Sequence, residues 1–320
     1  MRIDVHAHYF HPEYLACLAR CLGEAVTLHT ARAPGGHLTP EEILGLLDES
    51  GVDLLVLSPS ASQPYAPREA DAVAAARLCN DIYADLARRY PGRFAAFGTV
   101  PLPHVDAAIA EAARCLDTLG FVGINTGCSV AGRPLDDPAF DPFWAELNRR
   151  GAVLFLHPVG IGGPCMDKYN LAFLVGAPFE DTVAALRLVL SGVTTRYPRI
   201  RVIVPHLGGT LPFLLARIDG APGRGGPPRP RDACVEGPVS AHLRRFWYDT
   251  VNHDPNALRC ALAAFGADRL LLGSDFPYAT GEYYRHCVTY IGEVGLTPAE
   301  QEAVLGGNAA ALLGLAAQRG

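Results

Sequence analysis

The chain has 320 residues and a formal net charge of −6, with 49% of its residues hydrophobic and 19% charged. This composition supplies apolar surface for a large core and excludes a mainly disordered chain. The acidic balance argues against nucleic acid or a membrane as a partner, and no apolar run reaches the roughly 18–20 residues of a membrane span. Nine scattered cysteines without a CxxC pair are typical of reduced thiols in a cytoplasmic protein.

Eight short apolar runs alternate with helical segments along the chain. The runs are residues 3–8, 52–57, 95–100, 121–126, 153–157, 202–206, 246–251 and 270–275. Most are continuous and aliphatic, as buried parallel strands are. They predict an α/β fold, a (β/α)8 TIM barrel formed as a single domain over residues 1–320. A doubly wound open sheet is the alternative, but no G-x-G-x-x-G motif follows the first run.

Helix signals lie between the predicted strands. Thr39, followed by a proline and two glutamates, has the pattern of a helix N-cap, and Gly51 ends that helix. Amphipathic periodicity predicts three longer helices, over residues 68–90, 105–119 and 179–197. Two connections are longer than a simple barrel needs: residues 9–38 after the first strand and residues 220–244 before the seventh. We predict that both are insertions over the barrel, although a mobile surface loop explains the second equally well.

Polar residues end several predicted strands, and the carboxyl ends of barrel strands meet at one face. The first strand ends in His6-Ala7-His8, and a period of two places Asp4, His6 and His8 on one side of it. Three other strands end in His157, His206 and Asp275. Each of these residues alone has an ordinary structural explanation, as a rim hydrogen bonder or a turn former. Their coincidence at one face predicts a site for one divalent metal ion, most suited to Zn²⁺ with Mn²⁺ possible.

The remaining histidines carry weaker signals. His253 follows the seventh strand and is a candidate for the wall of the site or for a group behind the ligands. The histidines expected to be solvated are His11, His29, His37, His242 and His286.

The segments IDVHAH, LFLHP, VIVPHLGGTLPFLLARID, RFWYDT and LLLGSDFP together resemble the amidohydrolase superfamily. More narrowly, they resemble its 2-amino-3-carboxymuconate-6-semialdehyde decarboxylase branch, which includes decarboxylases of salicylate-, resorcylate- and orsellinate-type acids. The resemblance runs from Ile3 to about Leu315. It implies a TIM barrel that holds one divalent metal ion, often zinc.

The resemblance also implies roles for individual residues. The metal ligands would be His6, His8, His157 and Asp275. His206 would be the general acid/base, with a pKa lowered by the nearby cation, and Asp275 could also carry the proton. Arg217, eleven residues after His206, would reach the site of a neighbouring subunit, which implies a homodimer. A helix-end arginine that pairs locally is the alternative for Arg217.

The expected substrate pocket departs from that branch. Asn170 stands where the semialdehyde enzyme has an aromatic residue, and Tyr278 stands where it has phenylalanine. Only Arg32 lies near the position of that enzyme's arginine between the first strand and the first capped helix. Asn170, Tyr278, Arg217 and His253 are therefore the candidates for substrate binding, without an assigned substrate.

The resemblance favours a metal-dependent, non-oxidative decarboxylase of a small aromatic or unsaturated carboxylic acid. A metal-dependent hydrolase or hydratase on the same scaffold is the alternative, since both chemistries use a polarised oxygen. No lysine stands near the end of the fourth strand, GINTGC, where two-metal relatives carry a carboxylated lysine, which argues for one metal ion. A barrel kept only as a binding protein would have lost a ligand or His206, and all five residues are present.

Overall fold

The computed structural model describes residues 1–160, 165–220 and 233–315. Eight parallel strands form one sheet in the order β1-β2-β3-β4-β7-β8-β9-β10. They are β1 (Ile3–His8), β2 (Leu54–Ser58), β3 (Phe94–Thr99), β4 (Gly123–Gly127), β7 (Val153–His157), β8 (Arg201–Val204), β9 (Trp247–Asp249) and β10 (Leu270–Leu271). Hydrogen bonds from Val5 N to Leu272 O (2.9 Å) and from His8 N to Phe276 O (2.7 Å) join β1 to the segment that directly follows β10. The prediction of a (β/α)8 barrel is confirmed.

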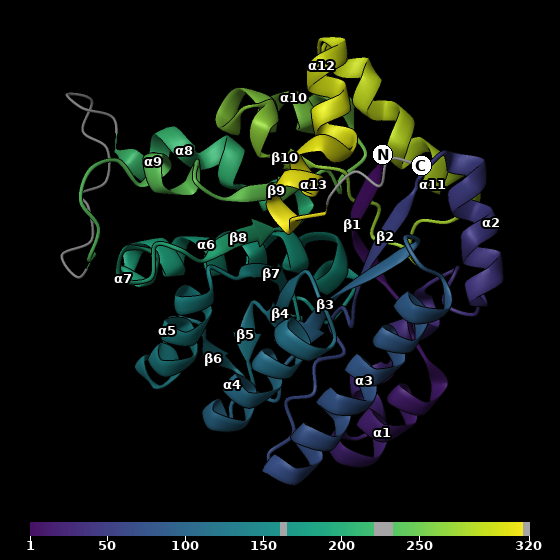
Figure 1. The fold of residues 1–320 in the computed structure, drawn as a ribbon. Coiled ribbons are helices and arrows are strands. Elements are labelled where there is room, and N and C mark those ends of the chain that lie inside the picture. Colours follow the sequence, from purple (N-terminus) through teal and green to yellow (C-terminus); the bar gives the residue numbers. More distant parts are fainter. Residues whose placement is uncertain (161–164, 221–232, 316–320) are drawn as a thin grey trace.

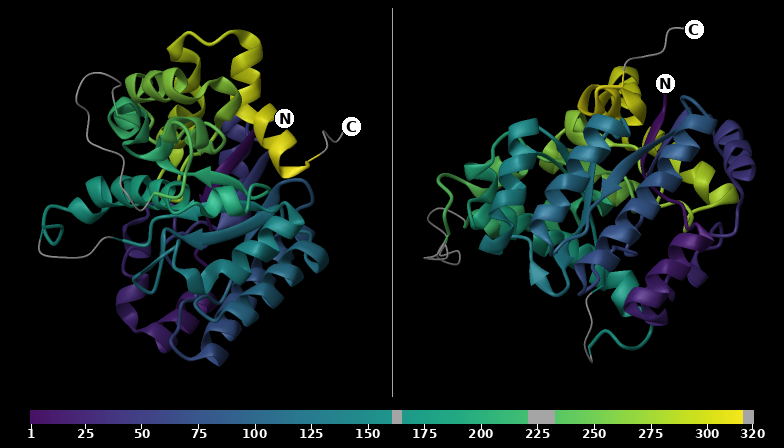
Figure 2. Two further views of the ribbon diagram at one scale, coloured as in Figure 1. Left: turned by 90° about the vertical axis from the view of Figure 1, so that its left-hand side faces the viewer. Right: turned by 60° about the horizontal axis from the view of Figure 1, so that its bottom comes forward.

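Helices surround the strands on all the sides that Figures 1 and 2 show. They are α1 (Pro12–Leu22), α2 (Pro40–Ser50), α3 (Glu69–Arg89), α4 (Val105–Ala113), α5 (Asp141–Arg150), α6 (Ala177–Leu190), α7 (Val193–Arg196), α8 (Leu211–Asp219), α9 (Val239–Leu243), α10 (Pro255–Phe265), α11 (Gly281–Thr289), α12 (Pro298–Glu302) and α13 (Asn308–Leu313). The predicted start of α2 is confirmed, because Thr39 and Glu42 form a reciprocal capping box. A short antiparallel pair, β5 (Ser129–Val130) and β6 (Arg133–Pro134), follows β4.

One predicted helix is two in the structure. The stretch 179–197 forms α6 and α7, which meet at Gly192. Gly192 has a φ of +76°, and a Cβ atom there would lie 3.0 Å from the Cβ of Cys234. Amphipathic periodicity continues through the break, so the pattern alone predicts a single helix.

Apolar side chains fill the inside of the barrel as well as the space between strands and helices. Ile3, Val5, Phe155 and Leu271 belong to the inner cluster, which Leu312 of α13 joins. The inner core therefore occupies the end of the barrel nearest α13 and leaves the carboxyl ends of the strands for polar groups.

Both predicted insertions carry helices. Residues 9–38 contain α1 and two 3-10 helices, η1 (Glu24–Thr27) and η2 (Thr30–Arg32), and α1 packs beside α3 (Figure 1). Of the second insertion, 220–244, residues 221–232 lie outside the described part, and α9 lies within the rest. Among the described helices, none is both long enough and apolar enough to cross a membrane.

Candidate metal centre and substrate cavity

Strand β1 supplies two of the predicted metal ligands, His6 and His8. Its pairing with β2 shifts register between Asp4 and Ala7, which marks a β-bulge. The prediction that Asp4 shares a face with the two histidines is therefore wrong. Asp4 instead accepts a hydrogen bond from Ser274 Oγ at 2.6 Å. Beyond the bulge, the rings of His6 and His8 lie with their centroids 5.1 Å apart.

Four buried side chains converge at the carboxyl end of the barrel. They are the predicted ligand set, His6, His8, His157 and Asp275. Each offers one ligand atom, and these atoms all lie within 4.8 Å of one another. The strand ends of a closed barrel thus bring together residues that are up to 269 positions apart in the sequence.

The three imidazoles of this set are each oriented by a hydrogen bond at Nδ1. The acceptors are Asp249 Oδ2 for His6 (2.7 Å), Ser58 O for His8 (3.1 Å) and Pro158 O for His157 (2.8 Å). Because these oxygens accept, they place the proton on Nδ1 and leave the lone pair on Nε2. Within the described part of the chain, Nε2 of His6 and Nε2 of His157 are buried without a hydrogen-bond partner. Buried acceptor nitrogens beside a carboxylate fit a bound cation.

The charges of the cluster fit the same conclusion. Burial lowers the pKa of His8 and lowers that of His157 well below its ordinary value, so both rings are neutral. Burial also acts to lower the pKa of His6, but Asp249 and Asp275 raise it to about 10. Burial acts to raise the pKa of Asp275, whereas His6 and His8 hold it well below its usual range. A divalent cation would displace the proton of His6 and balance the two carboxylates.

His206 lies beside this cluster, with Nε2 4.0 Å from Asp275 Oδ2. Its Nδ1 lies 2.7 Å from Asp181 Oδ2, and Asp181 also accepts a hydrogen bond from Cys128 Sγ at 3.3 Å. Burial acts to lower the pKa of His206, but the charge and the hydrogen bond of Asp181, together with the charge of Asp275, raise it overall. The lowered pKa expected from the sequence would therefore require a bound metal ion, since the net effect of the protein groups is to raise the pKa.

The sequence predicted that His206 and Asp275 are the last residues of two strands. In the structure both residues lie outside strands. Strand β8 ends at Val204 and β10 at Leu271, and the two residues have φ angles of +54° and +61°. Non-glycine residues seldom adopt this left-handed region, and those that do often serve a site. Backbone hydrogen bonds hold both: His206 N donates to Asp249 Oδ1 (2.9 Å) and Asp275 N to His6 O (2.9 Å).

A cavity of about 490 Å³ opens above the cluster, with His157, His206 and Asp275 among its lining residues. Its walls come from residues 25–34, 60–61, 158–160 and 170–177 and from Tyr278. Most of these wall side chains are apolar. Such a volume suits a small molecule with one ring.

The predicted substrate-binding residues divide into two groups. Asn170 and Tyr278 line the cavity, and Asn170 Oδ1 accepts a hydrogen bond from Arg32 Nη1 at 2.7 Å. His253 is buried but does not line the cavity. Arg217 is exposed on α8 and does not line it either. The chain's own cavity therefore includes Arg32 in place of Arg217.

Three residues of the site escaped the sequence analysis. Asp249 ends β9, and strand-end position is the same signal that pointed to the predicted ligands, so Asp249 could have been found in RFWYDT. Asp181 lies inside α6, where nothing in the sequence distinguishes it from a surface carboxylate. His29, expected to be solvated, lines the cavity with its Nε2 3.1 Å from Ser62 Oγ, and burial lowers its pKa to about 4.

Comparison with known proteins gives consistent relatives. The 2-amino-3-carboxymuconate-6-semialdehyde decarboxylase of Dictyostelium discoideum is 34% identical over 281 residues, covering 86% of this chain and 77% of that protein. The gamma-resorcylate decarboxylase of Rhizobium radiobacter is 33% identical over 261 residues, covering 73% and 76%.

Solved structures share the fold over almost the whole chain. A 2,6-dihydroxybenzoate decarboxylase in complex with 2,6-dihydroxybenzoate has a TM-score of 0.83 and 27% identity, covering 98% of this chain and 99% of that one. A dihydroxybenzoic acid decarboxylase of Polaromonas sp. JS666, solved with bound manganese, has a TM-score of 0.84 and 24% identity, covering 98% and 97%. The model of the amidohydrolase family matches residues 3–315, and the chain belongs to that family.

Proposed function

We propose that this protein is a metal-dependent, non-oxidative decarboxylase of a small aromatic or unsaturated carboxylic acid, such as an ortho-hydroxybenzoate. The observation that carries this proposal is the set of three imidazoles, each anchored at Nδ1, that converge with Asp275 on the floor of a ring-sized cavity. The relatives contribute the substrate class, since they are decarboxylases of such acids.

The resident cofactor is one divalent metal ion, held by His6, His8, His157 and Asp275. Three nitrogens and one carboxylate oxygen favour Zn²⁺, and Mn²⁺ is the alternative. When bound, such an ion would supply Lewis acidity at the substrate carboxylate.

His206 supplies the proton. For an ortho-hydroxybenzoate, the Nε2 proton of His206 first passes to the ring carbon that bears the carboxylate, and the ortho oxygen becomes a ketone oxygen as the ring supplies the electron pair. The bond between that carbon and the carboxylate then breaks, CO₂ leaves, and the electron pair returns to the ring and the ortho oxygen. Asp181 stabilises the imidazolium before the transfer. Asp275, 4.0 Å from His206 Nε2, offers a second route for the proton.

Recognition of the substrate falls to the walls of the cavity. Tyr278 lies with its ring centroid 5.5 Å from that of Phe173, and both face a ring-shaped substrate. Arg32, placed by Asn170, offers charged donors to a second polar group of the substrate. We assign His253 a place behind the site, since it does not line the cavity.

We also propose a homodimer in the cytoplasm, with Arg217 acting in the partner's cavity. Six of the ten exposed large hydrophobic side chains in the described part lie between residues 169 and 183, beside the cavity. Phe213, 83% exposed, stands one helical turn before Arg217 on α8. The nine cysteines of the sequence include no CxxC pair, which suits a reducing compartment.

Metal analysis of protein purified without added metal tests the proposal, followed by a CO₂-release screen on the same sample. The screen covers ortho-hydroxybenzoates, orsellinate-like acids and carboxymuconate semialdehydes. We expect about one metal ion per chain and CO₂ from at least one acid. Metal without CO₂ would move the assignment to a hydrolase or hydratase, and no metal after reconstitution would refute the ligand set.

Mixing two inactive variants tests the dimer. If Arg217 acts in the partner's cavity, mixing and reassociating His206→Asn and Arg217→Gln chains restores activity, because one cavity of each mixed dimer is intact. Activity that stays at the level of the separate variants would place Arg217 outside the site.

A further inference from the structure

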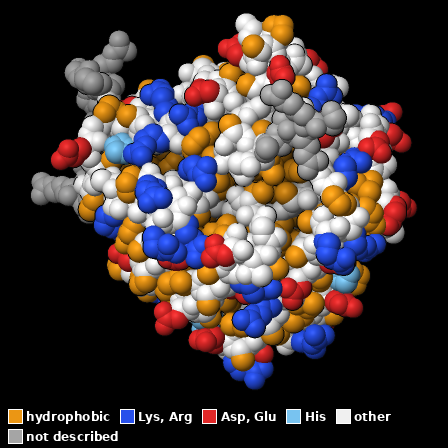
Figure 3. All heavy atoms as spheres, viewed as in Figure 1, with side chains coloured by type: hydrophobic (Ala, Val, Ile, Leu, Met, Phe, Trp, Pro, Cys, Tyr) orange, Lys and Arg blue, Asp and Glu red, His pale blue; other side chains and the backbone are white. Residues whose placement is uncertain are grey.

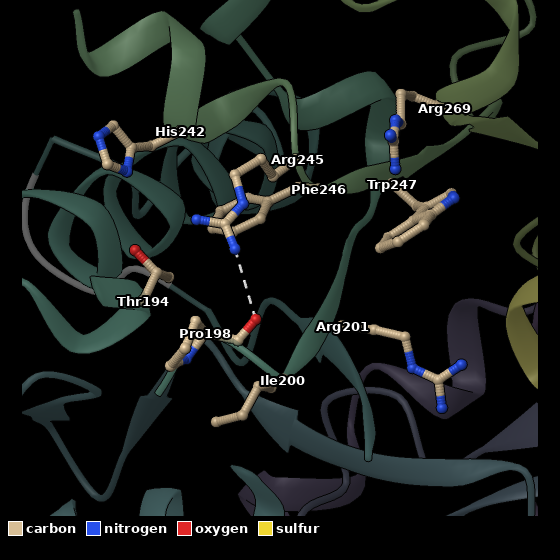
Figure 4. Close-up of a pocket in the computed structure, with 9 residues that line it drawn as sticks. All are labelled: Thr194, Pro198, Ile200, Arg201, His242, Arg245, Phe246, Trp247 and Arg269. Atoms are coloured by element: carbon tan, nitrogen blue, oxygen red, sulfur yellow. Dashed lines mark hydrogen bonds between the residues drawn. The ribbon is translucent and has the colours of Figure 1, made fainter. Parts of the chain in front are cut away.

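A second cavity, of about 200 Å³, lies at the opposite end of the barrel from the metal centre. Arg201 begins β8, Trp247 begins β9 and Arg269 directly precedes β10, so the cavity borders the amino ends of these strands. Figure 4 shows Arg245, Trp247 and Arg201 set around it, with Arg269 beside Trp247. The guanidinium carbon of Arg269 lies 4.8 Å from the centroid of the Trp247 ring.

The positive charge around this cavity is only partly balanced. Among the described residues, Arg201 donates only to backbone carbonyls, and burial lowers its pKa. Within the same part of the chain, the side chain of Arg245 has one long hydrogen bond, to Pro198 O at 3.4 Å. Arg269 pairs with Asp268, which is 73% exposed, at 3.3 Å. Within residues 1–160, 165–220 and 233–315, Asp268 is the one carboxylate that pairs with any of these three arginines. This local excess of positive charge contrasts with the net charge of −6 of the whole protein.

The surface view agrees with this imbalance, since Lys and Arg side chains gather on the side of the molecule that carries α7 and α9 (Figures 1 and 3). Thr194 and His242, which line the same cavity, each have one buried polar atom, Oγ1 and Nδ1, without a hydrogen-bond partner among the described residues. Buried polar atoms are normally paired, so these two atoms are unmet polar groups in residues of the cavity wall. His242, expected to be solvated, is thus part of a cavity wall.

We propose that this cavity binds a small phosphate-type oxyanion. Arg245 and Arg269 would donate charge-assisted hydrogen bonds to it, and the positive charge of Arg201, whose donors are engaged with Gly151 O and Leu312 O, would add to the favourable field. The volume admits inorganic phosphate or the phosphate group of a small monoester. Because the cavity lies at the far end of the barrel, a bound anion would not compete with the substrate at the metal centre.

Tryptophan fluorescence of the metal-loaded enzyme tests this site directly. The chain has two tryptophans: Trp144 is fully buried, and Trp247 is partly exposed at the cavity. Inorganic phosphate, titrated at constant ionic strength against chloride, should change the emission saturably, and Trp247→Phe should abolish the change. A parallel titration with glycerol phosphate separates the two sources, because a site for a monoester binds it at least as tightly as the free ion.

Variants that remove charge distinguish a specific phosphate site from general electrostatic attraction of anions to the surface. We expect Arg245→Gln with Arg269→Gln to weaken phosphate binding at least about tenfold, as loss of two charged donors should. Arg199→Gln is the matched control, since Arg199 is exposed nearby but does not line the cavity, and it should change affinity less than about twofold. Three results would overturn the proposal: no saturable change, equal binding by the double variant, or equal weakening by the control.

Discussion

The floor and the roof of the substrate cavity are built differently. The floor consists of strand-end side chains that are buried and held by further hydrogen bonds, such as His6 on Asp249 and His8 on Ser58. The roof consists of segments that connect the strands, and there Phe173 and Leu174 are 46% and 62% exposed. Groups that perform chemistry thus stand on the rigid barrel, whereas groups that recognise the substrate stand on segments free to vary.

Loss of a floor ligand should have the largest effect. We expect His8→Ala to lose the metal ion and to reduce the rate of CO₂ release by more than about 100-fold. Loss of a group that only hydrogen-bonds to a ligand costs up to about 100-fold, and loss of a ligand itself should cost more. Metal content and kcat are measured on the same preparation. His37→Ala, which changes an exposed histidine, is the control. Full metal content with full activity would remove His8 from the ligand set.

The proton donor should be separable from the metal. We expect His206→Asn to keep the metal ion and to lower kcat by about 10²–10⁴-fold, the usual contribution of a general acid or base. A rate within about tenfold of the unmodified enzyme would exclude the proposed role.

The carboxylate of Asp249, which hydrogen-bonds to His6, should affect metal affinity rather than proton transfer. We expect Asp249→Asn to weaken metal affinity about 10–100-fold, because it replaces the carboxylate that accepts from His6 Nδ1 with a neutral amide and so weakens the orientation of the ring. Competition with a chelator measures this affinity. Unchanged affinity would mean that strand geometry alone orients the ring.

Asp181 should act on His206 without touching the metal. We expect Asp181→Asn to lower kcat about tenfold, with metal content and KM unchanged, because the imidazolium loses its charged partner. A change in KM instead of kcat would show that Asp181 only supports the shape of the cavity.

The roof should show the smallest effect, and mainly on binding. We expect Asn170→Ala to raise KM by up to about tenfold with little change in kcat, since it releases Arg32 from its hydrogen bond. Steady-state kinetics with two different acids would show the change as altered preference. A loss of kcat equal to that of His206→Asn would contradict the division between floor and roof.

The sequence predicted the floor more closely than the roof. Polar residues at the ends of predicted strands identified the four residues that converge, His6, His8, His157 and Asp275. The carboxyl ends of barrel strands lie at one face regardless of the conformation of the connecting segments. The same signal at Asp249 was available and overlooked. Asp181 and His29 could not be found this way, since a carboxylate within a helix and a histidine in a connection look like solvated groups until the chain folds over them.

By itself, the sequence determined the barrel, its eight strands and the identity of the four converging side chains, because buried parallel strands leave a continuous apolar pattern that polar residues end. Only the tertiary structure decided which nitrogen of each imidazole faces the candidate metal centre, that a bulge turns Asp4 away, and that Arg32 lines the cavity while Arg217 does not. These outcomes depend on hydrogen bonds and packing between residues far apart in the chain, and local periodicity contains no information about such pairs.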